Sequence, residues 1–245
     1  MPYWQELTHK QFVKACHETE VAVLMTGALE AHGDHLPLGS DNLLPAYLAE
    51  NVAAKTKALV LPIIPFGESW TFEQHEGTVT VDPATLLAFY GDIMGSVFHH
   101  GFRFIVALNG HGGNSSLLQL AARKATMGSE RSVIIVNWWT DLAKDVKQSI
   151  LETPEGHAAE DETSEMMHIR PELVDKSSYA VSDVRMKYTI VSARYREELF
   201  PSAVHGDPTR ATPEKGKRIM ERAAEELLEL IAQLERGELP LKKVG

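Results

Sequence analysis

Short apolar runs alternate with longer stretches of mixed polarity along the first part of the chain. Four runs are nearly continuously apolar, which is typical of strands covered on both faces of a sheet, and they lie at 21–26, 58–64, 103–108 and 132–136. Stretches with helical periodicity lie between them, at about 42–55, 83–100 and 115–126. This alternation predicts an α/β fold of three layers (α/β/α), with helices on both sides of a mostly parallel central sheet.

Two of the predicted helices begin with a capping signal. Asp82 stands directly before Pro83, as an N-cap residue stands before a proline at the first helical position. Thr212 stands in the same relation to Pro213 and opens a final helix that runs to about Glu235. We expect less regular structure before this final helix, with a loop entering a helix and then an extended stretch, at 156–168 and 179–192.

Length and composition predict a single globular domain over residues 1–245. The chain has 44% hydrophobic and 24% charged residues, close to the average of globular proteins. No stretch approaches the roughly 18 apolar residues that would cross a bilayer, and residues 1–10 do not resemble a signal peptide. The single cysteine, Cys16, cannot form an internal disulfide. We therefore expect a cytoplasmic protein with no membrane partner.

The balance of charge is acidic. The chain carries 34 acidic and 24 basic residues, which gives a formal net charge of −10. Such a surface repels the phosphate backbone, so we do not expect nucleic acid as a partner. The excess can reflect ordinary solubility, and it can also be offset in part by bound divalent cations.

Polar segments follow the predicted strands at the point where each strand ends. These segments are 30–35 with Asp41, 67–70, 109–114 and 137–139. Ligands bind beyond the carboxyl ends of the strands in a parallel sheet. Because parallel strands bring all these ends to one edge, we expect the four segments to share a single cleft.

The side chains in this cleft indicate a metal centre. Glu30 and His32 follow the first strand, Asp41 comes soon after, and His111 follows the third strand. Glutamate, histidine and aspartate without cysteine form a ligand set that suits Zn, Mn, Co or Fe(II). The two oxygens of Asp41 can bridge two metals, and such metals are typically about 3.5–4 Å apart.

Other interpretations of these polar segments stay open. Residues 109–114 alone could form a phosphate-binding turn at a helix N-terminus, although the turn contains a histidine and no lysine or arginine. We expect His35 to hydrogen-bond a ligand rather than to be one. Ser69 and Ser115 also lie near this edge, but neither stands in a nucleophile-elbow pattern.

A later acidic run, 156–166, has a simpler interpretation for most of its members. Acidic residues at a helix start are favoured by the helix dipole. We assign Glu160, Asp161 and Glu165 to that role.

Four motifs follow one another in a fixed order between residues 30 and 164. They are Glu30-x-His32-Gly33-x-His35-Leu36-Pro37 with Asp41, Asn109-Gly110-His111-Gly112-Gly113-Asn114, Gly156-His157-Ala158 and Glu162-Thr163-Ser164. Each motif alone is weak, but together they are specific. In combination they resemble the creatininase (creatinine amidohydrolase) family.

The resemblance implies a fold, a metal centre and an assembly. Members of the family are α/β/α enzymes with two divalent metal ions per subunit, Zn and/or Mn, with Fe also possible. They hydrolyse C–N bonds in cyclic or small amides and usually form homohexamers. By this resemblance Glu30, His32, Asp41 and His111 are metal ligands, with Asp41 as the bridge.

The chain departs from the creatininase pattern at several positions. Creatininase carries a ligand glutamate where this chain has Gly113. The Gly-Gly version looks like branches that contain formamide deformylases and a peptide-trimming peptidase, in which the glutamate that matches Glu162 supplies the missing ligand. The segment 71–78 and Ala159 also differ from the usual pattern. Creatinine itself is therefore not the substrate that we expect.

The resulting hypothesis is hydrolysis of a small-molecule amide, at a C–N bond other than a peptide bond. A hydroxide held between the two metals attacks the carbonyl carbon, and one metal polarises the carbonyl oxygen. By resemblance, His157 is the catalytic residue that stabilises the oxyanion or protonates the leaving nitrogen. Trp70, Trp138 and Trp139 either line the pocket or belong to the core or a subunit contact.

Two further functional interpretations remain beside this one. The same centre could act on another bond, as a formamide deformylase or a lactone hydrolase does. The chain could also be a non-catalytic metal-binding oligomer, although a complete ligand set argues against that interpretation.

Overall fold

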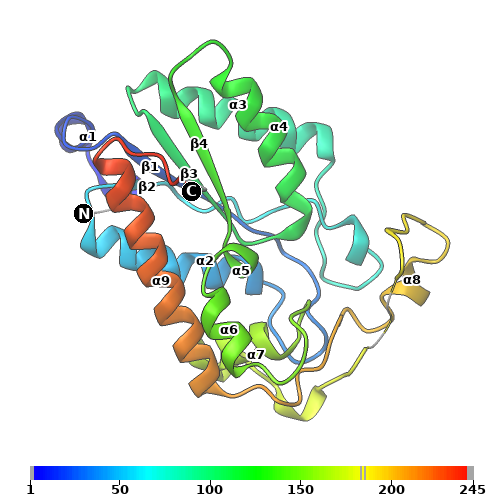
Figure 1. The fold of residues 1–245 in the computed structure, drawn as a ribbon. Coiled ribbons are helices and arrows are strands. Elements are labelled where there is room, and N and C mark those ends of the chain that lie inside the picture. Colours follow the sequence, from blue (N-terminus) through cyan, green and yellow to red (C-terminus); the bar gives the residue numbers. More distant parts are fainter. Residues whose placement is uncertain (1–2, 183, 185, 242–245) are drawn as a thin grey trace.

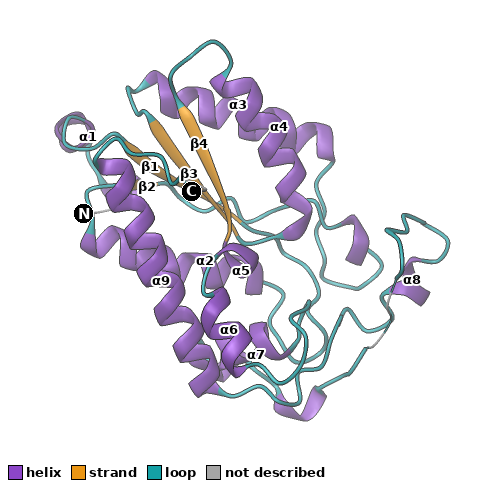
Figure 2. Cartoon of the chain, viewed as in Figure 1, coloured by secondary structure: helices purple, strands orange, loops and turns teal. Residues whose placement is uncertain are grey.

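Four parallel strands form the centre of the molecule. The computed structural model describes residues 3–182, 184 and 186–241. Its sheet has the strand order β2-β1-β3-β4, in which every neighbouring pair is parallel. The strands are β1 (Val21–Thr26), β2 (Leu59–Val60), β3 (Phe104–Asn109) and β4 (Ser132–Asn137). Figure 2 shows this sheet between the helices.

Helices cover both faces of the sheet, as the sequence predicts (Figure 1). The helices packed on one face are α2 (Ser40–Lys55), α7 (Glu160–Ile169) and α9 (Pro213–Glu235). Those on the other face are α1 (His9–Cys16), α3 (Pro83–His99) and α4 (Ser115–Thr126). The predicted fold class, a three-layer α/β/α arrangement with a parallel sheet, is therefore confirmed.

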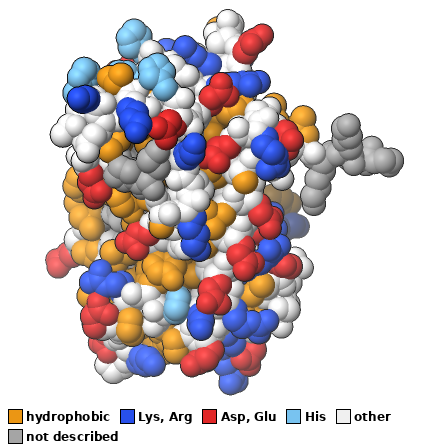
Figure 3. All heavy atoms as spheres, turned by 90° about the vertical axis from the view of Figure 1, so that its left-hand side faces the viewer, with side chains coloured by type: hydrophobic (Ala, Val, Ile, Leu, Met, Phe, Trp, Pro, Cys, Tyr) orange, Lys and Arg blue, Asp and Glu red, His pale blue; other side chains and the backbone are white. Residues whose placement is uncertain are grey.

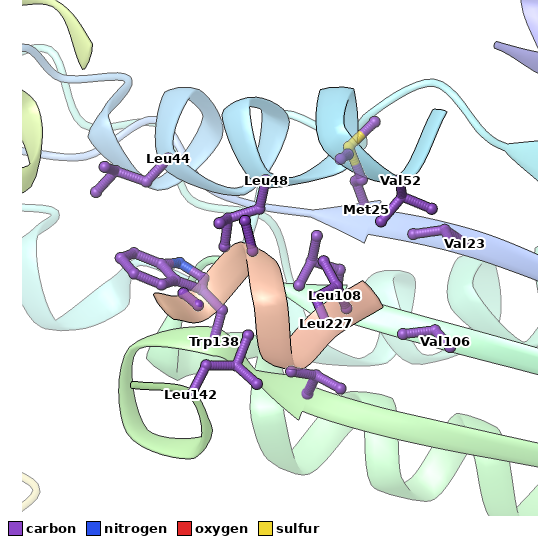
Figure 4. Close-up of a cluster of buried hydrophobic side chains, with 14 of the residues drawn as sticks. Val23, Met25, Leu44, Leu48, Val52, Val106, Leu108, Trp138, Leu142 and Leu227 are labelled. Atoms are coloured by element: carbon purple, nitrogen blue, oxygen red, sulfur yellow. The ribbon is translucent and has the colours of Figure 1, made fainter. Parts of the chain in front are cut away.

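Alternation along each strand divides the core into two layers. Val23 and Met25 of β1 pack with Leu44 and Leu48 of α2 on one side of the sheet, as Figure 4 shows. Leu24, which lies between them in the strand, points to the opposite layer and packs among the side chains of α3 and α4. Because successive side chains of a strand point to opposite faces, a fully apolar run is what two covered faces require.

The predicted helix starts agree with the structure. The carboxylate of Asp82 accepts the N–H groups of Ala84 and Thr85 at the start of α3. The hydroxyl of Thr212 accepts the N–H of Lys215 at the start of α9. Both helices begin at a proline, whose missing N–H costs nothing at that position.

The predicted second strand is longer than the observed one. The strand β2 has two residues, and Ile64 then pairs with Thr26 only through an isolated bridge. Pro62 lies between these points, and a proline has no N–H to give to a sheet ladder. The expected extended stretch at 179–192 likewise forms no strand among its described residues, apart from a bridge between Ser182 and Gly206.

Shorter elements fill the connections. The short α-helices are α5 (Trp138–Asp141), α6 (Lys144–Ile150) and α8 (Arg196–Leu199). The 3-10 turns are η1 (Trp4–Glu6), η2 (Trp70–Phe72), η3 (Gly112–Asn114), η4 (Pro171–Leu173) and η5 (Lys176–Ser178). Within the described residues, none of the helices combines the length and the apolar character that crossing a membrane requires. Figure 3 shows acidic, basic and apolar side chains interspersed on one face of the molecule.

Candidate metal centre

The carboxyl ends of β1 and β3 carry the candidate ligands, as parallel topology predicts. Glu30 and His32 lie in the loop that follows β1, and His111 lies two residues beyond the end of β3. Asp41 lies in the first turn of α2, and all four residues are buried. The structure thus brings together four side chains from positions 30 to 111 of the sequence.

One group of possible ligands consists of Glu30, Asp41 and His111. Atom Nδ1 of His111 lies 2.8 Å from Oδ2 of Asp41 and 3.4 Å from Oε1 of Glu30. One donor atom from each of the three residues lies within 4.8 Å of the others. This spacing is suited to three ligands around one ion.

A second group consists of His32, Asp41 and Glu162. Atom Nε2 of His32 lies 3.1 Å from Oδ1 of Asp41 and 4.0 Å from Oε2 of Glu162. Asp41 belongs to both groups, and it turns one oxygen to each: Oδ2 to His111 and Oδ1 to His32. This arrangement is what a bridging carboxylate needs, so the bridging role remains our prediction for Asp41.

Backbone carbonyls fix the orientation of the two histidines. Nδ1 of His32 lies 3.0 Å from the carbonyl oxygen of Glu30, and Nε2 of His111 lies 2.7 Å from that of Glu68. When the rings are neutral, as metal binding requires, and each of these nitrogens donates its hydrogen, the other ring nitrogen has a free lone pair facing Asp41. A partner of this kind sets the tautomer of a metal-binding histidine.

His157 completes the cluster from the loop before α7. Its Nε2 lies 2.9 Å from the carbonyl oxygen of Ala31, and its Nδ1 lies 3.8 Å from Oε1 of Glu30. The ring lies between those of His32 and Phe72, with centroid distances of 4.2 Å and 4.3 Å. Burial, followed by the charge of His32, lowers the pKa of His157 to about 4, so its ring is neutral near pH 7.

Protonated histidines offset most of the carboxylate charge of this cluster when no metal is bound. Burial alone would lower the pKa of His32, but Asp41 and two other carboxylates raise it to about 10. Glu30 and Asp41 likewise overcome burial and raise the pKa of His111 to about 9. The Oε2 atom of Glu30 is buried and finds no hydrogen-bond partner among the described residues. Carboxylates and imidazoles placed in this way fit a divalent transition metal.

Two glycines allow the chain to approach the centre closely. A Cβ atom at Gly110 would lie 2.1 Å from the carbonyl oxygen of Asp41. A Cβ atom at Gly113 would lie 1.9 Å from the carbonyl oxygen of Glu68. The place where creatininase is expected to hold its glutamate is therefore filled here by backbone.

Two neighbouring residues lie where they cannot coordinate within these groups. The Nε2 atom of His35 lies 3.0 Å from the hydroxyl of Thr163, at the back of α7. Asp34 is exposed to solvent. Neither residue belongs to a group of possible metal ligands among the described residues.

The acidic run at the start of α7 is not a solvent-exposed helix cap. Glu160, Asp161 and Glu165 are all buried. Oxygens of Glu160 accept the N–H groups of Glu152 and Thr153 and lie 2.6 Å from Nζ of Lys215. The helix dipole therefore explains only part of their placement, because each of these carboxylates also has buried partners.

A cavity of about 400 Å³ opens over the ligands. Its walls include Phe72, Phe200, Trp139 and the backbone of Gly112 and Gly113. Trp138 is instead part of the core, and Trp70 lines an adjoining cleft beneath the guanidinium of Arg196. Of the three tryptophans considered from the sequence, only Trp139 thus lines this cavity.

Sequence reasoning placed Glu68 in the cleft only as part of segment 67–70, and it missed other cavity residues. Phe72, Phe200, His205 and Glu68 line the cavity but belong to no recognised motif. Glu68 and Phe72 follow the second strand, and ligands bind beyond the carboxyl ends of parallel strands, so the sequence indicated their region. Phe200 and His205 come from the irregular region before α9, where no periodic pattern indicates a position in space.

A family model described as "Creatininase: Creatinine amidohydrolase" matches residues 5–231 of the chain. The creatinine amidohydrolase of Pseudomonas putida is 33% identical over 189 residues, which cover 69% of this chain and 72% of that protein. The 3-dehydro-scyllo-inosose hydrolase of Thermotoga maritima is 27% identical, over 95% of this chain and 83% of that protein. The mycofactocin precursor peptide peptidase of Mycolicibacterium smegmatis is 29% identical, over 81% and 79%.

Solved creatininase structures share the fold. One described as "Creatininase Mn" has a TM-score of 0.86 and 26% sequence identity, and the match covers 95% of this chain and 98% of that one. A mutant creatininase of Zn-Zn type has a TM-score of 0.85 and 27% identity over the same shares. The similarity thus extends to proteins described with either manganese or zinc.

Proposed function

This chain belongs to the creatininase family, and from that premise we propose that it is a metal-dependent amidohydrolase that cleaves a C–N bond through two divalent ions. The observation that carries the proposal is Asp41, whose two oxygens face two separate groups of ligands in one cavity. Glu30 and His111 would hold one ion with Asp41, and His32 and Glu162 would hold the other. Zn and Mn are the metals that this donor set and the related structures favour.

The ions would supply polarisation of the substrate carbonyl and a water molecule whose pKa is lowered toward about 7. The protein itself supplies a proton carrier. His157 is neutral, and if its Nε2 hydrogen is donated to the carbonyl of Ala31, its Nδ1 is free to accept a proton. We infer that Nδ1 takes the proton released on attack and delivers it to the leaving nitrogen.

The walls of the cavity would set the substrate. Phe72 stacks on His157 with an angle of 16° between the rings, so it holds the imidazole plane and excludes water from one side. A volume of about 400 Å³ suits a small molecule. Because backbone fills the space beside Gly113, we propose a small amide other than creatinine.

A second candidate is a different bond at the same centre. The relatives include proteins named as an inosose hydrolase and as a peptide peptidase. Formamides, lactones and short peptides are therefore the competing substrates, and a metal-binding oligomer without activity is the remaining alternative.

One experiment separates these candidates. Chelated protein is reloaded with Zn or Mn and assayed against creatinine, formamides, small cyclic amides, lactones and short peptides. We expect hydrolysis of at least one amide only after reloading. Metal uptake without hydrolysis of any of these substrates would favour the non-catalytic alternative, and no uptake of metal at all would exclude the metal centre.

We also propose that the protein is a homo-oligomer, with the hexamer expected from the family. An apolar cavity of about 660 Å³ supports a contact with another copy, since exposed Phe66 and Phe89 both line it. Such an apolar surface is suited to subunit contact. Light scattering coupled to gel filtration would measure the mass of the assembly.

A further inference from the structure

A lysine is fully buried beside the metal centre. Lys147 lies in α6, and its side chain has no exposed area. Its ammonium donates to the carbonyl oxygen of Trp139 at 2.6 Å and to Oε2 of Glu155 at 3.4 Å. A buried ammonium is costly unless partners of opposite charge surround it.

Two further carboxylates surround this ammonium. Oδ2 of Asp161 and Oε1 of Glu165 each lie 3.7 Å from Nζ of Lys147. Burial alone would lower the pKa of Lys147, but Glu165, Asp161 and Glu155 together raise it above its usual value. The lysine is therefore charged at neutral pH.

The partners of Lys147 belong to three separate segments around the catalytic cavity. Trp139 follows β4, Glu155 lies in the loop that carries His157, and Asp161 stands beside Glu162 at the start of α7. The residues Trp139, Glu155 and Asp161 all line the cavity. One ammonium thus touches three parts of the cavity wall, and two of them carry a catalytic or ligand residue.

We propose that Lys147 is a positioning residue, whose ammonium holds the His157 loop and the start of α7 together so that Glu162 and His157 face the metal centre. The two segments meet in one contact, in which the N–H of Ala158 donates to Oε2 of Glu162 at 2.6 Å. A second contact joins the N–H of Gly156 to Oδ1 of Asp161 at 3.4 Å. The role assigned to Lys147 rests on the proposed function, since Glu162 and His157 belong to it.

A second lysine, Lys215 of α9, also pairs with a carboxylate of α7 and provides a matched control. The Nζ atom of Lys215 lies 2.6 Å from Oε1 of Glu160, the first residue of α7. Glu160 accepts from the backbone of Glu152 and Thr153 and is absent from the groups of possible metal ligands. Both lysines therefore stabilise the start of α7, but only Lys147 contacts the cavity wall.

The first measurement uses metal-free protein, so that it does not depend on activity. Amide hydrogen exchange is followed at Ala158 and Gly156 in the parent, in Lys147→Met and in Lys215→Met. We expect exchange at Ala158 to rise about tenfold in Lys147→Met, because a hydrogen bond to a charged acceptor is loosened. Lys215→Met should leave it unchanged. An equal rise in exchange at Ala158 in both variants would mean that Lys147 only stabilises the fold in general, and it would overturn the proposal.

Two further variants protect the test against misfolding of Lys147→Met. Lys147→Met/Glu165→Leu removes a buried carboxylate together with the ammonium, and such replacement by apolar residues is often tolerated. Glu155→Gln weakens only the tie to the loop, at a residue whose side chain is 42% exposed. Both should raise exchange at Ala158 and Gly156, and parent-like exchange in both folded variants would also overturn the proposal.

The second measurement is zinc affinity, determined by competition with a chelator. We expect Lys147→Met/Glu165→Leu to bind the ion at the site of His32, Asp41 and Glu162 about 10–100-fold less tightly. Such a loss is typical of residues that orient metal ligands. Lys215→Met should bind as the parent does. If the parent takes up no zinc, the proposed function fails, while the exchange data still decide whether Lys147 holds the two segments. If zinc binds equally well in all variants, the positioning role is wrong and the proposed function stands.

Discussion

Two buried clusters of acidic side chains lie next to each other in this molecule, and they differ in the source of positive charge. The cluster that contains Asp41 has three carboxylates and three histidines, and no lysine or arginine lines its cavity within the described residues. Around Lys147 are three carboxylates and one ammonium. The positive charge of the second cluster is a lysine ammonium, whereas that of the first comes from histidines, which can give up their protons to bind a metal.

The difference shows in how each cluster holds protons. Burial raises the pKa of Glu165 to about 8, although Lys147 lowers it, so this carboxyl is largely neutral at pH 7. Protonation of Glu165 and the charge of Lys147 together reduce the imbalance of the second cluster. In the first cluster, His32 and His111 are held protonated by carboxylates that a metal would otherwise neutralise. A buried acidic cluster offset by histidines can therefore exchange protons for a metal ion, whereas one built around a lysine keeps its own cation.

Replacing Asp41 should have the largest effect on metal content and rate, because it disrupts the whole first cluster. Asp41→Ala removes one oxygen from each group of ligands, so both ions should be lost together. The rate should fall by more than about 100-fold, since even residues that only orient metal ligands cost about 10–100-fold. Elemental analysis and the rate of hydrolysis measure both effects. Asp34→Ala, at an exposed position, is the control, and equal metal loss in both variants would mean that Asp41 is not the bridge.

The next comparison is between two glutamates of one helix turn. Glu162→Gln should weaken one metal site and lower turnover by orders of magnitude, because Glu162 faces His32 and Asp41. Glu160→Gln should leave metal content and rate nearly unchanged, because Glu160 faces Lys215. Its cost should appear in the free energy of unfolding, at up to about 1.5–3 kcal/mol, the contribution of a hydrogen bond to a charged group. Metal loss in Glu160→Gln, with full occupancy in Glu162→Gln, would reverse the assignment.

For His157 we expect an effect on the rate alone, without loss of metal. His157→Ala should lower turnover by about 10²–10⁴-fold, the usual contribution of a general acid–base group. Metal content should stay intact, because the two groups that share Asp41 do not include His157. Loss of an ion in this variant would indicate that the third group, Glu30 with His32 and His157, is itself a metal site. Metal stoichiometry and rate, measured on one preparation, distinguish these outcomes.

The pH dependence of metal binding should give the most specific signal. At pH 7 the pKa values of about 10 for His32 and about 9 for His111 leave both rings protonated in metal-free protein. Metal binding should release about two protons, and affinity should rise about 100-fold per pH unit until these pKa values are passed. Calorimetry in buffers of different ionisation enthalpy counts the protons. Release of none at pH 7 would contradict the assignment of both histidines.

The same shifts fix the sign of the stability change. Both pKa values are raised on folding, so the protonated histidines contribute their full stability to metal-free protein below about pH 6.5. That contribution declines above this pH and is lost as pH rises through about 9–10. Thermal unfolding of chelated protein should therefore move to lower temperature over this range. Metal-loaded protein should lack this histidine contribution.

The sequence predicted the parts of the molecule whose placement follows from periodicity. Apolar runs located the strands, and parallel pairing then brought Glu30, Asp41 and His111 to one edge. Glu162 and His157 were found only through the family motifs, because the loop before α7 has no period to place it. The structure brings both of them to the ligands, and their roles stay predictions.

Other features depend on contacts that no local pattern records. The acidic residues of α7 looked like a simple helix start, since nothing nearby in sequence indicates that Lys147 and Lys215 pair with them. Phe200 reaches the cavity from an irregular segment for the same reason. Pro62 ended the second strand sooner than its apolar residues suggest, because a missing N–H outweighs a favourable composition.

The backbone beside Gly113 limits how this enzyme could have diverged from creatininase. A glutamate at position 113 would place its Cβ 1.9 Å from the carbonyl oxygen of Glu68, which also lies 2.7 Å from the ring of His111. No single substitution can therefore exchange one ligand arrangement for the other. The segment around Glu68 would have to move first, and His111 would then lose the carbonyl that orients it. We therefore expect that a laboratory lineage that introduces a ligand glutamate at position 113 must begin with insertions or deletions near position 68.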